Sequence, residues 1–86
     1  MPGQVVPPPR RLKGFPNAFR VGAKTPRSGG GLRTRWKDQN NGRIYEWDYQ
    51  HGRVEAYNRR GEHPGEYDAD TGQRLNGPTP GRTVIP

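Results

Sequence analysis

In the second half of the chain, apolar and aromatic residues alternate with polar ones in short runs that turns separate. Alternation with a period of two residues is typical of a β-strand that has one buried face. The runs cover residues 32–36, 43–48, 53–58, 62–68 and 73–76. The segments between them each end in a glycine, which readily adopts the positive φ of tight turns, at 40–42, 50–52, 59–61 and 70–72. The pattern predicts a mainly β fold, a small and highly twisted antiparallel sheet of about five strands.

Residues 1–31 have a different composition. They contain three consecutive prolines at 7–9 and the flexible run 28–31, and their apolar residues are too sparse for a lasting period. We expect a linker or Pro/Gly-rich N-terminal arm over residues 1–31, and a folded domain that carries the chemistry over residues 32–86. Within the arm, a short N-terminal helix is predicted from the spacing of its apolar residues, Leu12, Phe15, Ala18 and Phe19.

Composition limits the fold and indicates the kind of partner. The chain of 86 residues is 27% hydrophobic and has no cysteine and two histidines, so the core is thin and neither disulfides nor zinc are expected to stabilise it. The formal net charge of +7 favours binding to a polyanion, with nucleic acid as the first expectation. No apolar run has the length of a membrane-spanning segment. Cysteine usage does not decide the compartment.

The segment 43–58 predicts a hairpin with one apolar and one polar face. With residues 49–52 as the loop, the cross-strand pairs are Asp48 with Arg53, Trp47 with Val54, Glu46 with Glu55, and Tyr45 with Ala56. Because side chains alternate between faces, the polar face carries Glu46, Asp48, Arg53, Glu55 and Tyr57, with His51 at the lip of the loop. Two carboxylates directly opposite each other tend to raise the pKa of one of them, which suits a general base.

The polar face holds the groups that cleavage of RNA without a metal requires. One group takes the proton of the 2′-hydroxyl, a second protonates the departing 5′-oxygen, and a cation stabilises the charge on the phosphate. Glu55, His51 and an arginine can fill these roles, and Asp48 is close enough in sequence to orient the imidazole. The alternative is a solvated strand face with a loop histidine, and composition by itself favours this alternative.

A longer set of residues resembles one known family. The matching positions are 29–31, 35–36, 43–48, 50–52, 55, 57, 72–73, 75, 77–78, 80 and 82. Between residues 24 and 82 they resemble the C-terminal cytotoxic domain of the ribosome-inactivating colicins and cloacins, and similar domains end contact-dependent inhibition toxins and pyocin-like bacteriocins. The most specific part of the match is the stretch Tyr45-Glu46-Trp47-Asp48, followed by Gln50-His51-Gly52.

The resemblance implies a bacterial toxin endoribonuclease with a small twisted sheet and a short N-terminal helix. Such a domain cuts the small-subunit ribosomal RNA at the decoding site, without a metal or another cofactor, and leaves a 2′,3′-cyclic phosphate. The implied partners are the ribosome, a cognate acidic immunity protein and the upstream delivery domains of a larger toxin. That toxin would be made in the producer cytoplasm, secreted or displayed, and would act in the target-cell cytoplasm.

Carried over residue by residue, the catalytic positions of the family fall on Asp48, His51, Glu55 and Arg82. The resemblance then assigns Glu55 as the general base and His51 as the general acid, although these two labels are exchangeable. Asp48 orients His51, and Arg82 stabilises the charge on the phosphate. Aromatic residues of the family's site fall on Tyr45, Trp47 and Tyr57.

The chain departs from the family at three places. Asn76 stands where the colicins have a lysine, so that one cationic contact to phosphate is lost or is supplied by Arg74. Arg53 replaces an acidic residue and adds charge next to Asp48. The tail stops soon after Arg82, without the basic ending of the colicin chains. These departures concern the RNA contacts and the immunity partner more than the chemistry.

The remaining basic and aromatic residues give further expectations. We expect Arg33, Arg35 and Lys37 to follow phosphates, or else to charge an edge strand against aggregation. Trp36 is expected to pack in the core, His63 to lie on the surface without a role, and residues 68–72 to form a turn instead of a calcium loop. The predicted RNA-binding residues are Tyr45, Trp47, Tyr57, Arg33, Arg35, Lys37, Arg53 and Arg74.

Two other functions fit the same composition. A basic RNA-binding β module without catalysis would tolerate the loss of His51 and Glu55 as long as binding survives. An RNase toxin of the same fold aimed at transfer RNA would differ only in its cleavage site.

Overall fold

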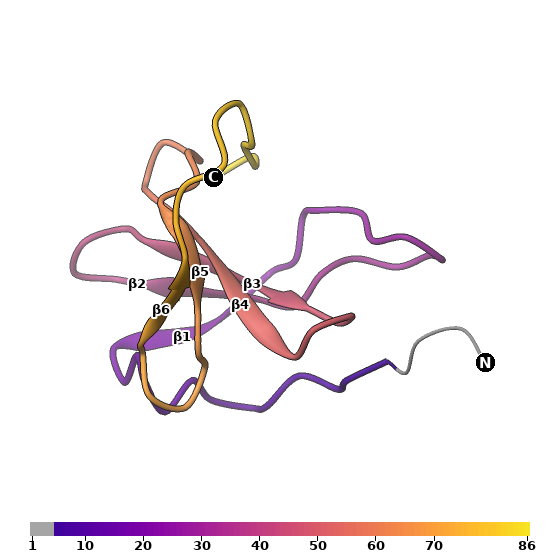
Figure 1. The fold of residues 1–86 in the computed structure, drawn as a ribbon, viewed down its shortest axis with the longest axis horizontal. Coiled ribbons are helices and arrows are strands. Elements are labelled where there is room, and N and C mark those ends of the chain that lie inside the picture. Colours follow the sequence, from indigo (N-terminus) through magenta and orange to yellow (C-terminus); the bar gives the residue numbers. More distant parts are fainter. Residues whose placement is uncertain (1–4) are drawn as a thin grey trace.

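The computed structural model describes residues 5–86 and places six short strands in one antiparallel sheet (Figure 1). The strands are β1 (Ala18–Val21), β2 (Arg35–Asp38), β3 (Ile44–Asp48), β4 (Arg53–Tyr57), β5 (Gly65–Tyr67) and β6 (Arg74–Asn76). Their order in the sheet is their order in the chain, so the fold is a meander. The strong twist is visible in Figure 1, where β6 runs nearly across the direction of β2. The prediction of a mainly β, twisted antiparallel sheet is confirmed.

The predicted N-terminal helix is wrong. Residues 5–86 contain no helix, and therefore none with the length and apolar character of a membrane span. The segment before β1 forms tight turns, in which Phe15 N donates to Leu12 O and Ala18 N donates to Phe15 O, each at 3.0 Å. Pro16 has no N–H to continue a helix. From Ala18 onward the backbone is extended and pairs with β2, starting at Ala18 opposite Asp38.

The N-terminal arm contributes to the fold more than its composition predicts. Leu12 and Ala18 are each 1% exposed and belong to the hydrophobic core. The arm also supplies acceptors for the indole N–H groups of the core tryptophans, since Trp36 Nε1 donates to Arg10 O at 3.2 Å and Trp47 Nε1 donates to Val6 O at 2.7 Å. β1, which lies within the predicted arm 1–31, pairs with β2 of the sheet.

The core lies on one face of the central strands. Its buried members are Leu12, Ala18, Trp36, Tyr45, Trp47, Val54, Ala56 and Ala69. Trp36 is fully buried and packs edge-on against Trp47, with ring centroids 6.3 Å apart, which confirms its expected packing role.

The predicted register of the central hairpin is confirmed at every pair. Asp48 lies opposite Arg53 and Glu46 opposite Glu55, and the two apolar pairs follow as predicted, Trp47 with Val54 and Tyr45 with Ala56. The hairpin therefore directs its acidic residues away from the aromatic core and toward a common face.

One loop design recurs along the meander. Asp38, Asp48 and Asp68 each end or follow a strand, and the Oδ1 of each accepts hydrogen bonds from the backbone N–H groups two and three residues later. The glycine four residues after each aspartate has φ between 70° and 76° and donates its N–H to the aspartate carbonyl. Residues 68–72 are thus a turn, as predicted. The third position after the aspartate is Asn41, His51 or Thr71, so the loop geometry is general and the histidine is the special feature.

Candidate active site

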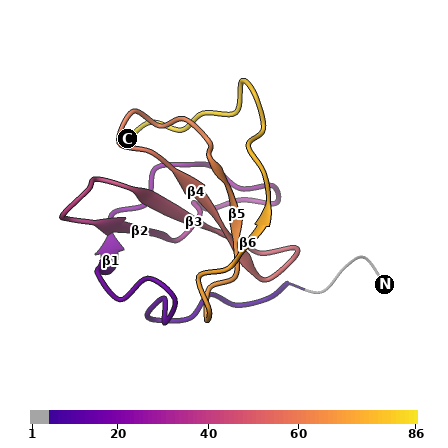
Figure 2. The same cartoon turned by 60° about the vertical axis from the view of Figure 1, so that its left-hand side comes forward.

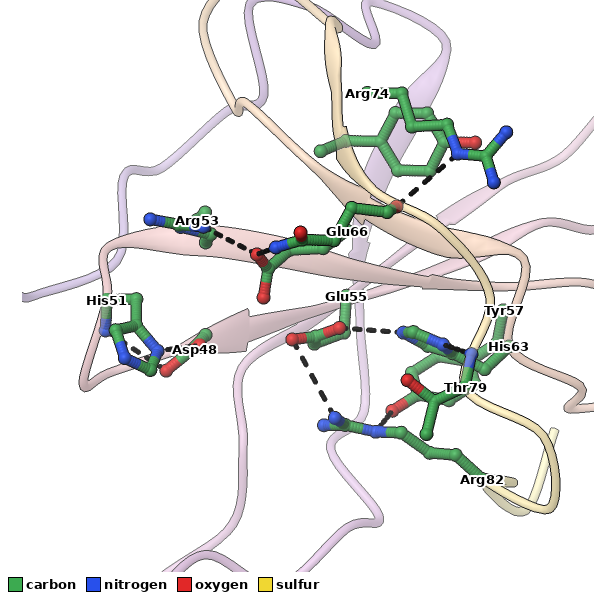
Figure 3. A network of polar contacts seen from close by, with 12 residues as sticks. Asp48, His51, Arg53, Glu55, Tyr57, His63, Glu66, Arg74, Thr79 and Arg82 are labelled. Atoms are coloured by element: carbon green, nitrogen blue, oxygen red, sulfur yellow. Dashed lines mark hydrogen bonds and ion pairs between the residues drawn. The ribbon is translucent and has the colours of Figure 1, made fainter.

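The polar face of β3, β4 and β5 carries a connected group of titratable side chains (Figure 3). The loop after β3 closes one end of this group. The C-terminal segment 77–86 closes the other end, running back past the turn between β4 and β5 (Figure 2). Val84 N donates to Gly61 O at 2.9 Å, and Glu62 forms a bridge with Thr83, so that the tail is bonded to this turn.

Asp48 and His51 form the first pair of the site. Asp48 Oδ2 lies 2.8 Å from His51 Nδ1, while Asp48 Oδ1 accepts the backbone N–H groups of the loop. Partial burial acts to raise the pKa of Asp48, but hydrogen bonds from His51 and Gln50 outweigh it and hold the pKa below its ordinary value. The His51 side chain is 52% exposed, so the bond at Nδ1 leaves Nε2 available to a substrate. The Asp48 carboxylate is thus within hydrogen-bonding distance of the imidazole, and its role in orienting His51 stays a prediction.

Glu55 and His63 form the second pair, which is buried. His63 Nε2 lies 2.7 Å from Glu55 Oε1, and the Thr79 backbone N–H donates to His63 Nδ1 at 3.0 Å. Since Nδ1 accepts a hydrogen bond it carries no proton, which assigns His63 as the neutral imidazole that donates from Nε2 to Glu55. The expectation that His63 lies on the surface is wrong, because the residue is 7% exposed.

Arg82 reaches the same carboxylate from the C-terminal segment. Its Nε donates to the Tyr57 hydroxyl at 2.9 Å, and its Nη1 lies 3.8 Å from Glu55 Oε2. The Arg82 side chain is 37% exposed. Glu55 thus has His63 on one oxygen and a partly exposed arginine beside the other.

Glu66 completes the group and was missed by the reasoning from sequence. It lies opposite Glu55 across β4 and β5. Carboxylate oxygens of Asp48, Glu55 and Glu66 lie within 4.8 Å of one another. Arg53 Nη1 donates to Glu66 Oε1 at 2.6 Å. A basic side chain of the protein already contacts each of the three carboxylates, His51 at Asp48, His63 at Glu55 and Arg53 at Glu66.

The pKa of Glu55 is raised, as the like-charge argument predicted, but the cause is different. Burial is the largest contribution, and hydrogen bonding with Glu66 adds to it, against the lowering effects of His63 and Arg82. Glu46, the predicted cause, is neutralised by Arg35, whose Nε and Nη2 donate to Glu46 Oε2 at 3.0 and 2.8 Å. The carboxylate that helps to raise the pKa of Glu55 is therefore Glu66 of β5.

The predicted RNA-binding residues fall into two groups. The partly or fully exposed ones are Arg33, Lys37, Arg53 and Arg74. The buried ones are Arg35, Tyr45, Trp47 and Tyr57, each at most 4% exposed. Arg35 lies opposite Glu46 in the sheet and forms an ion pair with it. Its guanidinium is therefore not exposed to phosphates, contrary to the expectation. The three aromatic residues support the sheet, and the Tyr57 hydroxyl contacts Arg82.

Arg53 and Asn76, two of the positions at which the chain departs from the family, contact the same carboxylate. Asn76 Nδ2 donates to Glu66 Oε1 at 2.7 Å, the same oxygen that accepts from Arg53. Arg74 Nε reaches only the Asn76 carbonyl, at 3.4 Å, and the side chain points away from Glu55 (Figure 3).

Taken together, the fold and the site define a small antiparallel β domain with a histidine, buried carboxylates and arginines on one open face. The family model named Cytotoxic matches residues 6–85. Colicin E3 of Escherichia coli is 48% identical over 63 residues, which cover 71% of this chain and 11% of that protein. Cloacin and colicin-E6 of Escherichia coli are 43% and 41% identical over 75 residues, which cover 85% of this chain and 13% and 14% of those proteins.

The chain therefore belongs to the Cytotoxic family, and it spans about a seventh or less of the length of the colicins and the cloacin that it matches.

Proposed function

We propose that this domain is a ribonuclease that cleaves RNA by acid–base catalysis without a metal. The observation that carries the proposal is the placement of the Asp48–His51 pair and the Glu55–His63 pair on one face, with Arg82 beside Glu55. A base, an acid and a cation are the groups that transphosphorylation of RNA needs.

In the proposed reaction, Glu55 takes the proton of a 2′-hydroxyl through its Oε2. The 2′-oxygen attacks the adjacent phosphorus while the bond from phosphorus to the 5′-oxygen breaks. His51 gives a proton from Nε2 to the departing 5′-oxygen, which leaves a 2′,3′-cyclic phosphate and a free 5′-hydroxyl. Arg82 stabilises the negative charge that builds on the phosphate oxygens. The exposed imidazole of His51 suits contact with a leaving group, which favours His51 as the acid and Glu55 as the base in this proposal.

His63 has a positioning role in this proposal. As a neutral imidazole that donates to Glu55 Oε1, it occupies one carboxylate oxygen and directs the other toward Arg82 and the substrate. The backbone of Thr79 fixes the tautomer of His63, so the C-terminal segment contributes to the base as well as supplying Arg82.

We infer that the target is the small-subunit ribosomal RNA at the decoding site, and that cleavage there stops translation. The relatedness to colicin E3, cloacin and colicin-E6 supports this target. The formal net charge of +7 suits a polyanionic substrate and also an acidic immunity protein that protects the producer. The domain would be the toxic part of a larger protein that is secreted or displayed and acts in the cytoplasm of a target cell.

The test is cleavage of intact bacterial ribosomes by the domain in the presence of EDTA, with the RNA ends mapped by primer extension. His51→Ala removes the proposed acid, and Thr71→Ala changes the equivalent position of the loop 68–72 and serves as the matched control. One discrete cut in the small-subunit RNA that is made by the wild type and Thr71→Ala, but not by His51→Ala, supports the proposal. Ribosome binding without a cut would favour the RNA-binding module, and cuts confined to added transfer RNA would change the target but keep the chemistry.

A further inference from the structure

Glu66 has an arrangement of partners that the proposed reaction does not explain. Its carboxylate lies beside Glu55, and its side chain is 12% exposed. Two side chains donate to the same oxygen, Arg53 from β4 at 2.6 Å and Asn76 from β6 at 2.7 Å. Three neighbouring strands therefore converge to hold one carboxylate in place next to the proposed base.

These contacts stabilise the ionised form of Glu66. Burial acts to raise the pKa of Glu66, but hydrogen bonding with Glu55, Arg53 and Asn76 outweighs it and lowers the pKa. Glu55 shows the opposite behaviour, since burial and Glu66 together raise its pKa. The contacts favour the negative charge on Glu66 and a shared proton on Glu55, because a guanidinium and an amide donate to Glu66 at 2.6 and 2.7 Å, whereas the guanidinium of Arg82 lies 3.8 Å from Glu55.

Every element around Glu55 contributes charged or titratable groups to this balance. β3 carries Asp48 and Glu46, the loop after it carries His51, β4 carries Arg53 and Tyr57, the connection from β4 to β5 carries His63, β5 carries Glu66, and the C-terminal segment carries Arg82. Most of these groups already have one dedicated partner, such as Arg35 for Glu46 and His51 for Asp48. Glu66 is the carboxylate that lies both opposite Glu55 and in contact with a partly exposed cation.

We propose that Glu66, Arg53 and Asn76 act as one positioning unit that holds a negative charge beside Glu55 and thereby sets the pH range in which Glu55 can accept a proton from RNA. This inference rests on the proposed function, in which Glu55 is the base. Glu66 supplies the charge, and Arg53 limits its effect because the guanidinium compensates part of it. None of the three residues needs to touch the substrate for the unit to act.

The proposal predicts opposite effects for two conservative substitutions. Glu66→Gln removes the negative charge, so ionisation of Glu55 becomes easier and its titration midpoint moves down. Arg53→Gln leaves Glu66 uncompensated and removes a nearby cation, so the midpoint moves up. A charge at this separation shifts a carboxyl midpoint by about one pH unit or more.

The first measurement is the titration of Glu55, followed by NMR of labelled glutamate carboxyl carbons in the free domain. It needs no RNA, so it reports on the unit even if the proposed function fails. Arg60→Gln removes an exposed arginine from the turn 59–61 and serves as the charge-matched control, for which a shift below about 0.3 unit is expected. If Glu66→Gln fails to fold, Asn76→Ala on the exposed edge strand takes its place: it removes a donor that stabilises the ionised form of Glu66, so the Glu55 midpoint is expected to move down, opposite to Arg53→Gln. Equal midpoints in all variants, or shifts of the same sign for Glu66→Gln and Arg53→Gln, would overturn the proposal.

The second measurement is the pH dependence of single-turnover RNA cleavage. The acid limb of the profile is expected to move down in Glu66→Gln and up in Arg53→Gln, by about one unit, or about tenfold in rate on the limb. In the double variant, the limb should follow Glu66→Gln, because the partly exposed guanidinium of Arg53 is held near Glu55 by its contact with Glu66. Simple addition of the two single shifts would show that Arg53 acts by itself and would refute the unit. A wild-type domain that cleaves no RNA would refute the proposed function instead, and the titration would still decide on the unit.

Discussion

The substitution Asp48→Asn tests how the negative charge of Asp48 affects His51. The two oxygens of Asp48 have separate tasks, since Oδ1 holds the backbone of the loop and Oδ2 contacts His51 Nδ1 at 2.8 Å. Asparagine retains an oxygen for the loop but places an NH₂ group where Oδ2 lay. The imidazole Nδ1–H then loses its acceptor, and the protonated imidazole loses its counter-charge.

The chain provides a matched control for this change in Asp68→Asn. Asp68 Oδ1 accepts the same pair of loop N–H bonds, at 2.9 and 3.0 Å, but Thr71 takes the place of the histidine. The effects of the substitution on the loop itself should therefore be similar in the two variants. We expect Asp48→Asn to lower the cleavage rate about 10²- to 10⁴-fold, the range for loss of general acid–base catalysis. Asp68→Asn should change the rate by less than about threefold, as surface substitutions usually do.

The assay is single-turnover cleavage of intact ribosomes with the domain in excess, together with thermal unfolding of each variant. Thermal unfolding shows whether a loss of rate reflects a loss of folded protein. The reasoning would be refuted by an Asp48→Asn domain that cleaves within about threefold of the wild type. An equal loss of rate in both variants would attribute the effect to the loop and not to the histidine.

Three further predictions concern the buried pair and its cation. Because folding raises the pKa of Glu55, it favours the protonated form; this stabilisation is complete below the unfolded-state pKa and is lost as the pH rises through the folded-state pKa. Glu55→Gln should therefore raise the melting temperature at about pH 7 and hardly at about pH 4 while cleavage is lost, and equal effects at both pH values would contradict this. His63→Ala leaves Glu55 and the Thr79 N–H without their partner, so urea unfolding should show a loss of about 1–3 kcal/mol, and an unchanged free energy would speak against the buried bond. Arg82→Lys keeps the charge but loses the planar contacts, so cleavage should fall about 10²-fold, with a smaller loss in Tyr57→Phe, and a lysine variant of wild-type rate would show that charge suffices.

The arrangement of the site gives stability and chemistry opposite requirements. Glu55 is 3% exposed and its pKa is raised, so the ionised carboxylate that the proposed reaction needs lowers the stability of the folded state. His63 and Arg82 offset this cost by contacting one oxygen each. Both come from segments that follow the central hairpin, so the C-terminal part of the chain is needed for Glu55 to act as the proposed base.

The sequence by itself determined the features that depend on near neighbours in the chain. Alternation and turn glycines predicted the central hairpin with its register, the core face of Tyr45 and Trp47, and the approach of Asp48 to His51. These contacts span few residues, so local periodicity and loop length leave little freedom. The resemblance to the family added Arg82, which local pattern could not have placed.

Only the tertiary structure decided which groups surround Glu55. His63 looked like a surface residue because the segment that covers it, around Thr79, comes sixteen residues later, beyond the reach of any strand period. Glu66 was missed and Arg35 was misread for a related reason: the pairing of β5 with β4 and of β2 with β3 fixes which charge meets Glu55 and which meets Glu46. The arm and β1 contribute Leu12 and Ala18 to the core, although the apolar residues of this part of the sequence are as sparse as those of a linker. The periodicity of apolar residues in the sequence predicts on which face of the sheet a side chain lies. Its charged partner depends on how distant segments of the chain pack against it, and this packing sets the pKa of a buried carboxylate.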